Sequence, residues 1–449
     1  MEKLRAMSLE ILCNCIFQWR IEEVNEDVEK TTVELIHYFE KLPGIIREEI
    51  LINFILRGFW DGQGHRVPEA RHIALFLHEE QKLLLMEFYS ENFDLEFLLK
   101  VNGHKLKNLI ELQLPDQSSL TANVCEEMCQ LMPNLKQLDL SGCFVEDDAM
   151  IYIAKLPLVA LDPGESIMEQ GVKQLCKEDS TARNTLRVLK LGNSGISVDC
   201  YCLILRTMKL IEDMDCFYST WLNTLSPIDL RRQQYNIRKL VFHYSLDAIE
   251  DELEIGVVTC PKVSKIDITS NIFTPKMLRT LTKFKELNTL NISVSSNSDV
   301  NIEDENQLFD RLCLGNLYFH NLIEFSLCDR KDGWISSGYL FAILEMCPNL
   351  EKLRLFQCDG FSNKIAGELA KLMAKKKLKH LMIDYCDLLG PSGIEDLLKI
   401  TSLIELEVNL FITEIKKQHF DAHPMQQTAE KHGVNLQLNI LVDQFIWFY

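Results

Sequence analysis

A spacing of leucine and related residues recurs along most of the chain and limits the fold more than any other feature of the sequence. The pattern is Leu-x-x-Leu-x-Leu-x-x-Asn/Cys, and one strong copy consists of Leu135, Leu138, Leu140 and Cys143. The second and third leucines lie two apart because alternate residues of a strand point to the same face. The final Asn or Cys follows where the chain leaves the strand. Asn can satisfy backbone groups there by hydrogen bonding, and Cys fits by small-residue packing.

Further copies continue at regular intervals. The third positions of thirteen copies are Phe88, Leu114, Leu140, Leu161, Leu191, Cys216, Phe242, Ile268, Ile292, Leu327, Leu355, Ile383 and Val408. Most intervals are 24 to 30 residues, within or close to the range of leucine-rich repeats. Between these strands the apolar residues take helical spacing, as at Val124, Met128 and Leu131. The expected fold is an α/β leucine-rich-repeat solenoid, a horseshoe with a parallel sheet inside and helices outside.

The repeats divide the chain into two parts. Residues 81–449 are expected to form the solenoid, and within them residues 434–449 to supply a last strand and an apolar cap. Residues 1–80 are expected to be helical, with two short segments that carry apolar stripes. The polar, acidic stretch 25–30 between these segments is expected to be a loop.

The first segment places apolar residues four apart, so that they share one stripe of a helix that Ser8 caps: Leu9, Cys13 and Phe17. The second segment has a proline near a helix start and then two isoleucines on one face: Leu42, Pro43, Ile46 and Ile50. Together the segments resemble the von Hippel–Lindau (VHL) box of substrate receptors for elongin–cullin ubiquitin ligases. The elongin-binding box of that family, (Ser/Thr/Pro)-Leu-x-x-x-Cys-x-x-x-apolar, is matched from Ser8 to Phe17. Its cullin box, apolar-Pro-x-x-apolar-x-x-x-apolar, is matched from Leu42 to Ile50.

A VHL box followed at once by leucine-rich repeats is similar to the Zyg/Zer group of receptors. The resemblance implies a substrate-recognition subunit that is not itself an enzyme and has elongin B/C, a cullin and a protein substrate as partners. Leu9 would insert into an apolar pocket of elongin C, with Cys13 and Phe17 alongside, and the second segment would face the cullin. The chain differs from that group because no armadillo-type domain follows the repeats. In the family that domain reads the N-terminal glycine of substrates, so this specificity is not carried over.

Two alternatives remain open for the N-terminal segments. Leu42 and Pro43 followed by Ile46, Ile50 and Leu51 can equally begin an F-box, which docks on Skp. The same residues can also pack together as a helical cap on the first repeat, because solenoids need such caps. In that case the protein is a leucine-rich-repeat scaffold or inhibitor outside any ligase.

The inner face of the predicted sheet is the expected substrate-binding surface, since its side chains alternate with the buried leucines. The candidate substrate-binding residues are the basic side chains in the middle of this face and the histidine beside them: Lys239, Lys265, Lys352, Arg354 and His380. Glu405 and Glu407 make one end acidic. A protein ligand with a partly acidic segment is expected to fit this face.

Composition excludes several other classes of function. Asp and Glu number 66 against 47 Lys and Arg, a net charge of −19, which disfavours binding to nucleic acids and anionic membranes. The 15 cysteines show no Cys-x-x-Cys spacing and suit a reducing compartment, so a cytoplasmic or nuclear location is expected. His419 and His423 lie four apart, but Pro424 is expected to end their helix. No catalytic residue, metal site or cofactor is predicted.

Overall fold

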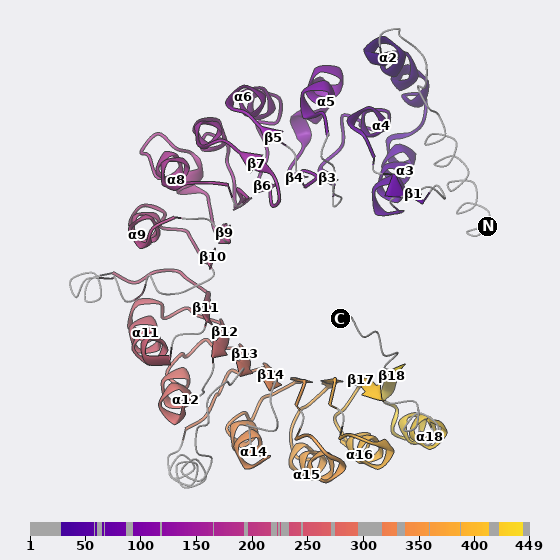
Figure 1. Cartoon of the computed structure of the whole chain (residues 1–449), viewed down its shortest axis with the longest axis vertical. Coiled ribbons are helices and arrows are strands. Elements are labelled where there is room, and N and C mark those ends of the chain that lie inside the picture. The colour runs from indigo at the N-terminus through magenta and orange to yellow at the C-terminus, as the bar shows by residue number, and fades with distance from the viewer. Residues whose placement is uncertain are drawn as a thin grey trace, which may run out of the picture. The chain divides into compact units, whose positions relative to one another are not determined.

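The computed structural model describes residues 28–57, 59–60, 65–66, 68–86, 93–116, 119–164, 166–192, 196–216, 222, 225, 233–243, 246–270, 274–294, 317–329, 337–358, 360–386, 388–412 and 422–442. The chain divides into two compact units, Met1–Cys216 and Phe217–Tyr449. Each unit is a leucine-rich-repeat solenoid segment, with a parallel sheet on one side and helices on the other (Figure 1). None of the described helices combines the length and apolar composition that crossing a bilayer requires.

The first unit begins with helices and continues into a six-stranded sheet. Its helices are α2 (Val28–Phe39), α3 (Gly44–Arg57), α4 (Ala70–Ala74), α5 (Leu95–Asn102), α6 (Ala122–Leu131), α7 (Met150–Ile153), α8 (Glu169–Leu175) and α9 (Val198–Thr207). The sheet has the order β10-β9-β8-β6-β4-β3. Its strands are β3 (Leu83–Leu85), β4 (Glu111–Gln113), β6 (Gln137–Asp139), β8 (Ala160–Asp162), β9 (Val188–Gly192) and β10 (Asp213–Cys216). Short pieces complete the unit: β1 (Phe59–Trp60), β2 (His65–Arg66), β5 (Ser119–Leu120), β7 (Phe144–Val145) and the 3-10 helices η1 (Gly103–Asn108), η2 (Asp147–Ala149) and η3 (Ala182–Asn184).

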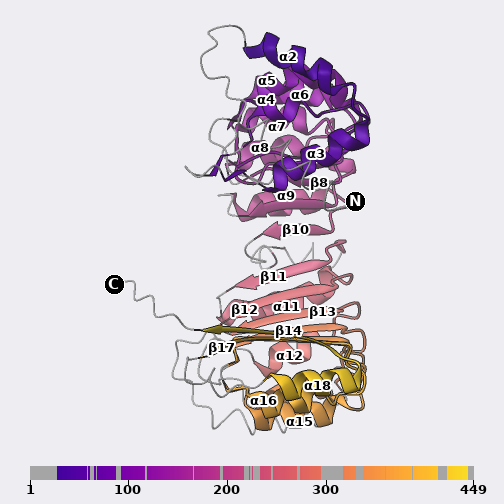
Figure 2. The same ribbon diagram turned by 90° about the vertical axis from the view of Figure 1, so that its right-hand side faces the viewer.

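The second unit contains an eight-stranded parallel sheet in which the strands follow one another in chain order (Figure 2). These strands are β11 (Lys239–His243), β12 (Lys265–Ser270), β13 (Thr289–Val294), β14 (Glu324–Asp329), β15 (Lys352–Phe356), β16 (His380–Asp384), β17 (Glu405–Ile412) and β18 (Asn435–Val442). Its helices are α11 (Leu246–Thr259), α12 (Pro275–Leu281), α14 (Ser337–Glu345), α15 (Asn363–Met373), α16 (Pro391–Leu397) and α18 (His423–His432).

The predicted leucine-rich repeat is confirmed in both units, because equivalent positions of successive copies pair in register. Leu112 lies beside Leu138 and Leu138 beside Leu161, and all three are at most 2% exposed. The second sheet continues the same arrangement from Leu240 to Leu406. One buried row of side chains therefore runs across each sheet, and the alternate residues face the other way.

Two copies in the first sheet were predicted two residues out of register. Since Leu138 is the second position of its copy, Leu161 is also a second position and not the expected third position. The first copy is shifted in the same way, because Leu84 pairs with Leu112, which makes Met86 its third position instead of Phe88.

Local signals begin the helices between the strands. The Asp94 carboxylate accepts a hydrogen bond of 2.8 Å from the Phe97 amide at the start of α5. Thr274 caps α12 in the same way, and Pro275 occupies its first turn. Such caps satisfy amides that have no partner inside the helix. Helices α5 and α12 thus begin at a defined residue on the outside of the sheet.

The cysteines of the repeat do more than fill space, which corrects the expectation of small-residue packing alone. The Cys143 thiol lies 3.4 Å from the carbonyl oxygen of Pro115, and the Cys358 thiol lies 3.8 Å from that of Leu327. Both cysteines are at most 7% exposed. Each thiol therefore acts as a weak donor to the preceding repeat.

Two local predictions were wrong. Residues 28–30 belong to α2 instead of a loop, because Thr32, Ile36 and Phe39 supply a helical stripe that extends the helix over the polar residues before it. Pro424 does not end a helix but lies in the first turn of α18, where a missing amide proton costs nothing.

The expected last strand is confirmed as β18, whereas residues 443–449 of the expected cap lie outside the described residues. The division after residue 216 was not predicted, and the functional boundary near residue 80 stays a prediction.

Candidate protein-binding surfaces

The second N-terminal segment lies at the start of α3. Pro43 is exposed, Leu42 and Ile46 are half-buried, and Ile50 is only 1% exposed. The structure therefore brings three of these residues to or near the surface and places Ile50 in the core. Leu9, Cys13 and Phe17 lie outside the described residues.

Ile50 lies inside because α3 packs on the segment around α4. The Phe54 ring, one turn further along α3, lies 6.1 Å from the Phe76 ring and 5.8 Å from that of His72. The Arg47 guanidinium donates a hydrogen bond of 3.0 Å to the carbonyl oxygen of Leu77. Burial lowers the pKa of His72 to about 4, so this ring is neutral in its apolar surroundings. Helix α3 therefore caps the end of the first unit with one face.

Apolar residues that the sequence analysis did not select lie on other faces of the N-terminal helices. On α3, Ile45 is 73% exposed and Ile52 is 48% exposed, and their spacing of seven residues puts them on one side of the helix. On α2, Tyr38 is 66% exposed beside a hollow of about 400 Å³. The signal was present in the sequence, because Ile45 and Ile52 fall off the stripe formed by Ile46, Ile50 and Phe54.

The five predicted substrate-binding residues all lie on the second sheet. One row of paired residues crosses this sheet on its exposed face: Lys239, Lys265, Thr289, Glu324, Lys352, His380, Glu405 and Asn435. Arg354 lies in the parallel row two residues further along each strand. Lys239 and Lys265 are neighbours, but Thr289 and Glu324 separate Lys265 from Lys352, so the basic residues form two groups instead of one continuous patch.

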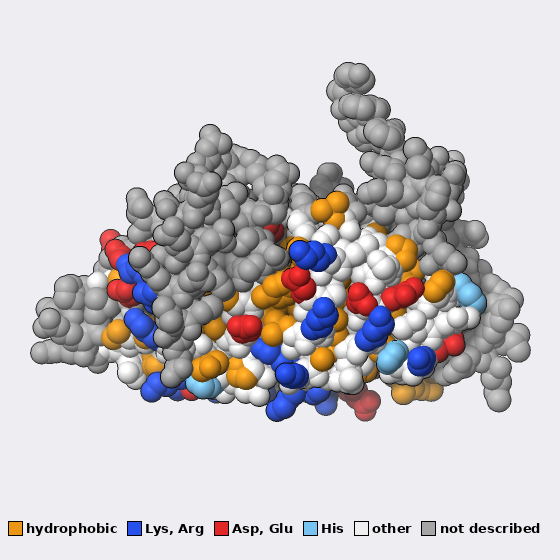
Figure 3. Space-filling view, turned by 90° about the horizontal axis from the view of Figure 1, so that it is seen from below, with side chains coloured by type: hydrophobic (Ala, Val, Ile, Leu, Met, Phe, Trp, Pro, Cys, Tyr) orange, Lys and Arg blue, Asp and Glu red, His pale blue; other side chains and the backbone are white. Residues whose placement is uncertain are grey.

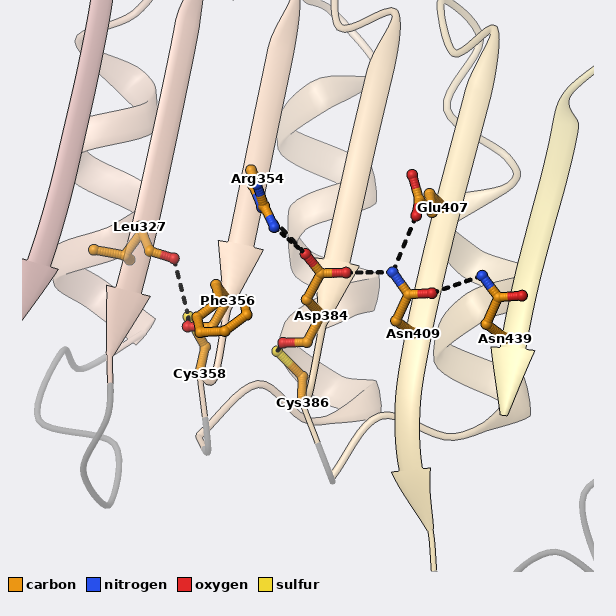
Figure 4. A network of polar contacts seen from close by, with 9 residues as sticks. All are labelled: Leu327, Arg354, Phe356, Cys358, Asp384, Cys386, Glu407, Asn409 and Asn439. Atoms are coloured by element: carbon orange, nitrogen blue, oxygen red, sulfur yellow. Dashed lines mark hydrogen bonds and ion pairs between the residues drawn. The ribbon is translucent and has the colours of Figure 1, made fainter. Parts of the chain in front are cut away.

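Arg354 belongs to a polar network that links four strands (Figure 4). Its Nε and Nη2 atoms lie 3.1 and 2.9 Å from Oδ2 of Asp384 on the next strand, whose side chain is 3% exposed. Asn409 donates from its Nδ2 to Asp384 and, over 3.1 Å, to Glu407. Asn439 extends the network to the next strand, where its Nδ2 donates a hydrogen bond of 2.8 Å to Oδ1 of Asn409. The network holds the Arg354 head in one place while leaving half of the side chain exposed.

Aromatic side chains and unusual backbone conformations lie beside this network. The Arg354 guanidinium lies 5.7 Å from the centre of the Phe356 ring, and that ring meets Tyr385 edge-on at 5.3 Å. Gln357 and Tyr385 have φ angles of 51° and 56°, in the left-handed region that non-glycine residues rarely adopt. Such conformations cost free energy and persist where the surroundings enforce them, often at binding surfaces. This end of strands β15 and β16 is thus a rigid surface with an exposed cation and aromatic rings.

The helical face of the second unit differs in character. In the part of it that Figure 3 colours, basic, acidic and apolar side chains are interspersed, without a block of one charge. Among the described residues, no three His, Cys, Asp or Glu side chains lie close enough together to hold a metal ion. Burial raises the pKa of Cys125, Cys129 and Cys347 to about 12, so these thiols are protonated and poor nucleophiles.

Comparisons with known proteins bear on the fold. The leucine-rich repeat family model matches residues 132–154, around the strong copy of the pattern at Leu135. No curated protein sequence matches the chain. The crystal structure of the Rad7 and Elc1 complex in yeast is similar at 14% identity, with a TM-score of 0.49, over 90% of this chain and 92% of that chain. The crystal structure of a TLR13–ssRNA13 complex is similar at 14% identity, with a TM-score of 0.40, over 80% of this chain and 49% of that chain.

Proposed function

We propose that this leucine-rich-repeat protein is a substrate-recognition subunit of a cullin–RING ubiquitin ligase. In this proposal the N-terminal helices bind elongin B/C and a cullin, and the exposed face of the second sheet binds a target protein. The chain acts by recruitment in the cytoplasm or nucleus, and no covalent chemistry takes place on it.

The observation that carries the proposal is the apolar surface at the start of α3. Pro43 and Ile45 are exposed there, Ile45 to 73%, and half-buried Leu42 and Ile46 flank them. Single exposed apolar residues are common on proteins, but several together at one helix start favour a partner. This cluster coincides with the segment that matches the cullin box.

The burial of Ile50 refines the roles within this segment. Ile50 and Phe54 fix α3 on the body of the first unit, each with 1% exposure. The opposite side of the helix start then presents Ile45 to a partner. In the elongin-binding segment, Leu9 would be the inserted anchor, with Cys13 and Phe17 beside it. Truncation of one such anchor costs about 2 kcal/mol or more, which is over tenfold in affinity.

For the target protein we propose the basic and histidine side chains of the second sheet: Lys239, Lys265, Lys352, Arg354 and His380. Arg354 is preorganised for binding, because its guanidinium already contacts Asp384 and Phe356. A group that is ordered before binding loses less conformational entropy on binding. An acidic segment of the target is the complement that these side chains favour.

A second candidate function is a scaffold or inhibitor without an adaptor. The packing of Phe54 against Phe76 and of Phe39 against Phe76, 5.1 Å between the latter rings, favours it, since α2 and α3 then serve as the cap of the solenoid. A Skp-binding F-box receptor is the third possibility. The cap and the docking site use different faces of α3, so the packing is compatible with all three functions.

The test is binding of the purified full chain to elongin B/C and, separately, to Skp by isothermal titration. Binding of elongin B/C is expected, with over tenfold weakening by Leu9→Ala plus Cys13→Ala. In a second titration the elongin complex is expected to bind a cullin, with over tenfold weakening by Ile45→Ser. The control is Leu388→Ser, which removes an exposed leucine (57%, against 73% for Ile45) from the second unit and is expected to leave binding unchanged. Circular dichroism checks that each variant folds.

Binding of Skp with no binding of elongin B/C would move the protein to the F-box class. Binding of neither adaptor by the wild-type chain would leave the scaffold function. If Leu388→Ser weakened binding of the partner as much as Ile45→Ser does, the Ile45 surface would have no specific role in that binding.

A further inference from the structure

An apolar groove lies between helix α3 and the edge strand β3 of the first sheet. It has a volume of about 230 Å³, and most of its lining is aliphatic: Leu51, Ile52, Ile55, Leu83, Leu84 and Leu85. Ile52 is 48% exposed, Leu83 47% and Leu85 36%. Three large apolar side chains from two elements thus border one groove, each partly accessible to solvent.

Gln81, at the base of the groove, shows how a ligand would be held. Its side chain is buried at 2% exposure, and its Nε2 donates a hydrogen bond of 2.6 Å to the carbonyl oxygen of Leu83. Its Oε1 has no hydrogen-bond partner among the described residues. Because the Leu83 carbonyl is already bound, the groove favours insertion of a side chain over addition of a strand at this position. A buried acceptor without a partner is costly, so a donor brought by a ligand would relieve that cost.

A second hollow, of about 340 Å³, adjoins the groove on the exposed face of the first sheet, and Leu85 lines both. Strand pairing places Leu85 beside Gln113, Gln113 beside Asp139, and Asp139 beside Asp162. One row across the sheet therefore changes from an apolar side chain through an amide to two carboxylates.

The charges along this row are unbalanced. Lys190 Nζ lies 3.4 Å from Asp162 Oδ2 and 3.9 Å from Asp139 Oδ2, so one ammonium group faces two carboxylates. Glu111 adds a third carboxylate to the lining of the hollow. Burial also raises the pKa of Asp162, which means that its charge is incompletely compensated in the free protein. A cationic ligand would supply the missing charge.

We propose that the α3–β3 groove and the adjoining hollow bind an extended protein segment in which a large apolar side chain precedes a basic side chain. Neighbouring strands lie about 4.8 Å apart, so β6 is about 10 Å and β8 about 14 Å from β3. An extended chain advances about 3.3 Å per residue. Because consecutive side chains of an extended chain point to opposite sides, one Lys or Arg is expected, three positions after the apolar residue opposite Asp139 or four positions after it opposite Asp162.

This site is separate from the basic side chains of the second sheet, which favour an acidic segment. Its existence does not require the chain to bind an adaptor. The residues to be changed are also outside the N-terminal helices, so loss of peptide binding and loss of adaptor binding are separate results.

The experiment is selection of a random nonamer peptide library, displayed on phage, by the immobilised full chain. Peptides with a large aliphatic or aromatic residue followed by Lys or Arg at the third or fourth position are expected to be enriched. The best of them, labelled with fluorescein, is then titrated by fluorescence anisotropy. We expect the Leu85→Ser variant to bind this peptide about tenfold more weakly than the wild type. The variant Asp139→Asn plus Asp162→Asn should bind it about fivefold more weakly, and its dissociation constant should depend less on salt concentration.

The control variant is Glu405→Gln plus Glu407→Gln, which removes two carboxylates from the equivalent face of the second sheet. It is expected to leave the anisotropy titration unchanged. No enrichment, enrichment of acidic peptides, or a dissociation constant unaffected by Leu85→Ser would each overturn the proposal.

Discussion

Glu252 lies on α11 of the second unit, where its side chain is 3% exposed. Burial raises the pKa of this carboxyl group from 4.5 to about 7. The folded protein therefore binds the proton more tightly than the unfolded chain does. This contribution to stability is complete below pH 4.5 and is lost as the pH rises towards 7.

Replacement of Glu252 by Gln should remove this pH dependence. At pH 8 we expect Glu252→Gln to be more stable than the wild type by about 2 kcal/mol, while at pH 5 the two should be close. Thermal unfolding at both pH values measures the difference. Glu254→Gln on the same helix is the control, because its side chain is 48% exposed and its contact with Lys276 Nζ is long, at 3.9 Å. A Glu252→Gln variant less stable than the wild type at pH 8 would contradict the argument.

Side-chain contacts between individual residues of neighbouring repeats could not be predicted from the sequence. Arg354 and Asp384 are 30 positions apart, and their contact depends on the register of β15 and β16. The sequence did place Arg354 on the exposed face, because the period of two along a strand settles which side a residue takes. It did not show that Asp384 would hold the guanidinium, since no local pattern links the two residues.

At the scale of elements, prediction succeeded where many copies of one pattern agree. The strands of the two large sheets from β3 to β17 follow the thirteen copies, although the copies at β3 and β8 were expected two residues out of register, and the expected helix at Val124 is α6. Helix α3 was expected as well, but which of its isoleucines face the core was only partly predicted. Ile46 and Ile50 define one stripe, yet the partner that buries Ile50 is the distant segment around Phe76, which nothing in the helix itself specifies. Faces of single helices are thus harder to predict than a repeated strand.

The contact between helices α15 and α16 yields a test at this scale. Asn363 Oδ1 accepts hydrogen bonds of 2.7 and 3.2 Å from the amides of Gly390 and Gly393, which joins the starts of the two helices. A Cβ atom at Gly393 would lie 2.5 Å from that oxygen and 2.9 Å from the Asn363 Cα atom. We expect Gly393→Ala to lower the free energy of unfolding by about 1–3 kcal/mol in urea denaturation.

Gly367, in the interior of α15, is the matched control. A Cβ atom there would meet only Asp396 Oδ2, at 3.1 Å, and this carboxylate can turn away. Since Ala favours a helix over Gly by about 0.5–1 kcal/mol, Gly367→Ala is expected to be neutral or stabilising. Similar losses for both variants would show that close helix contact is not the cause.

For the whole molecule, the two units have separate sheets and separate cores. Among the described residues, no strand of the six-stranded sheet pairs with a strand of the eight-stranded sheet, and β10 and β11 are end strands of these two sheets. Because repeats are stabilised by their nearest neighbours, a break in the sheet is where cooperativity is expected to fail. We therefore expect two transitions in differential scanning calorimetry of the full chain.

Leu112 and Leu381 test this expectation, because they occupy the same buried row in the two sheets and each is 1% exposed. Truncation of a buried leucine to alanine costs about 2–5 kcal/mol. For units of about 220 residues this corresponds to a Tm lower by about 5–15 °C. Leu112→Ala should shift only the transition of the first unit, and Leu381→Ala only that of the second. If both variants instead shift one common transition by similar amounts, the two sheets unfold together, and coupling must pass through the stretch of chain between β10 and β11.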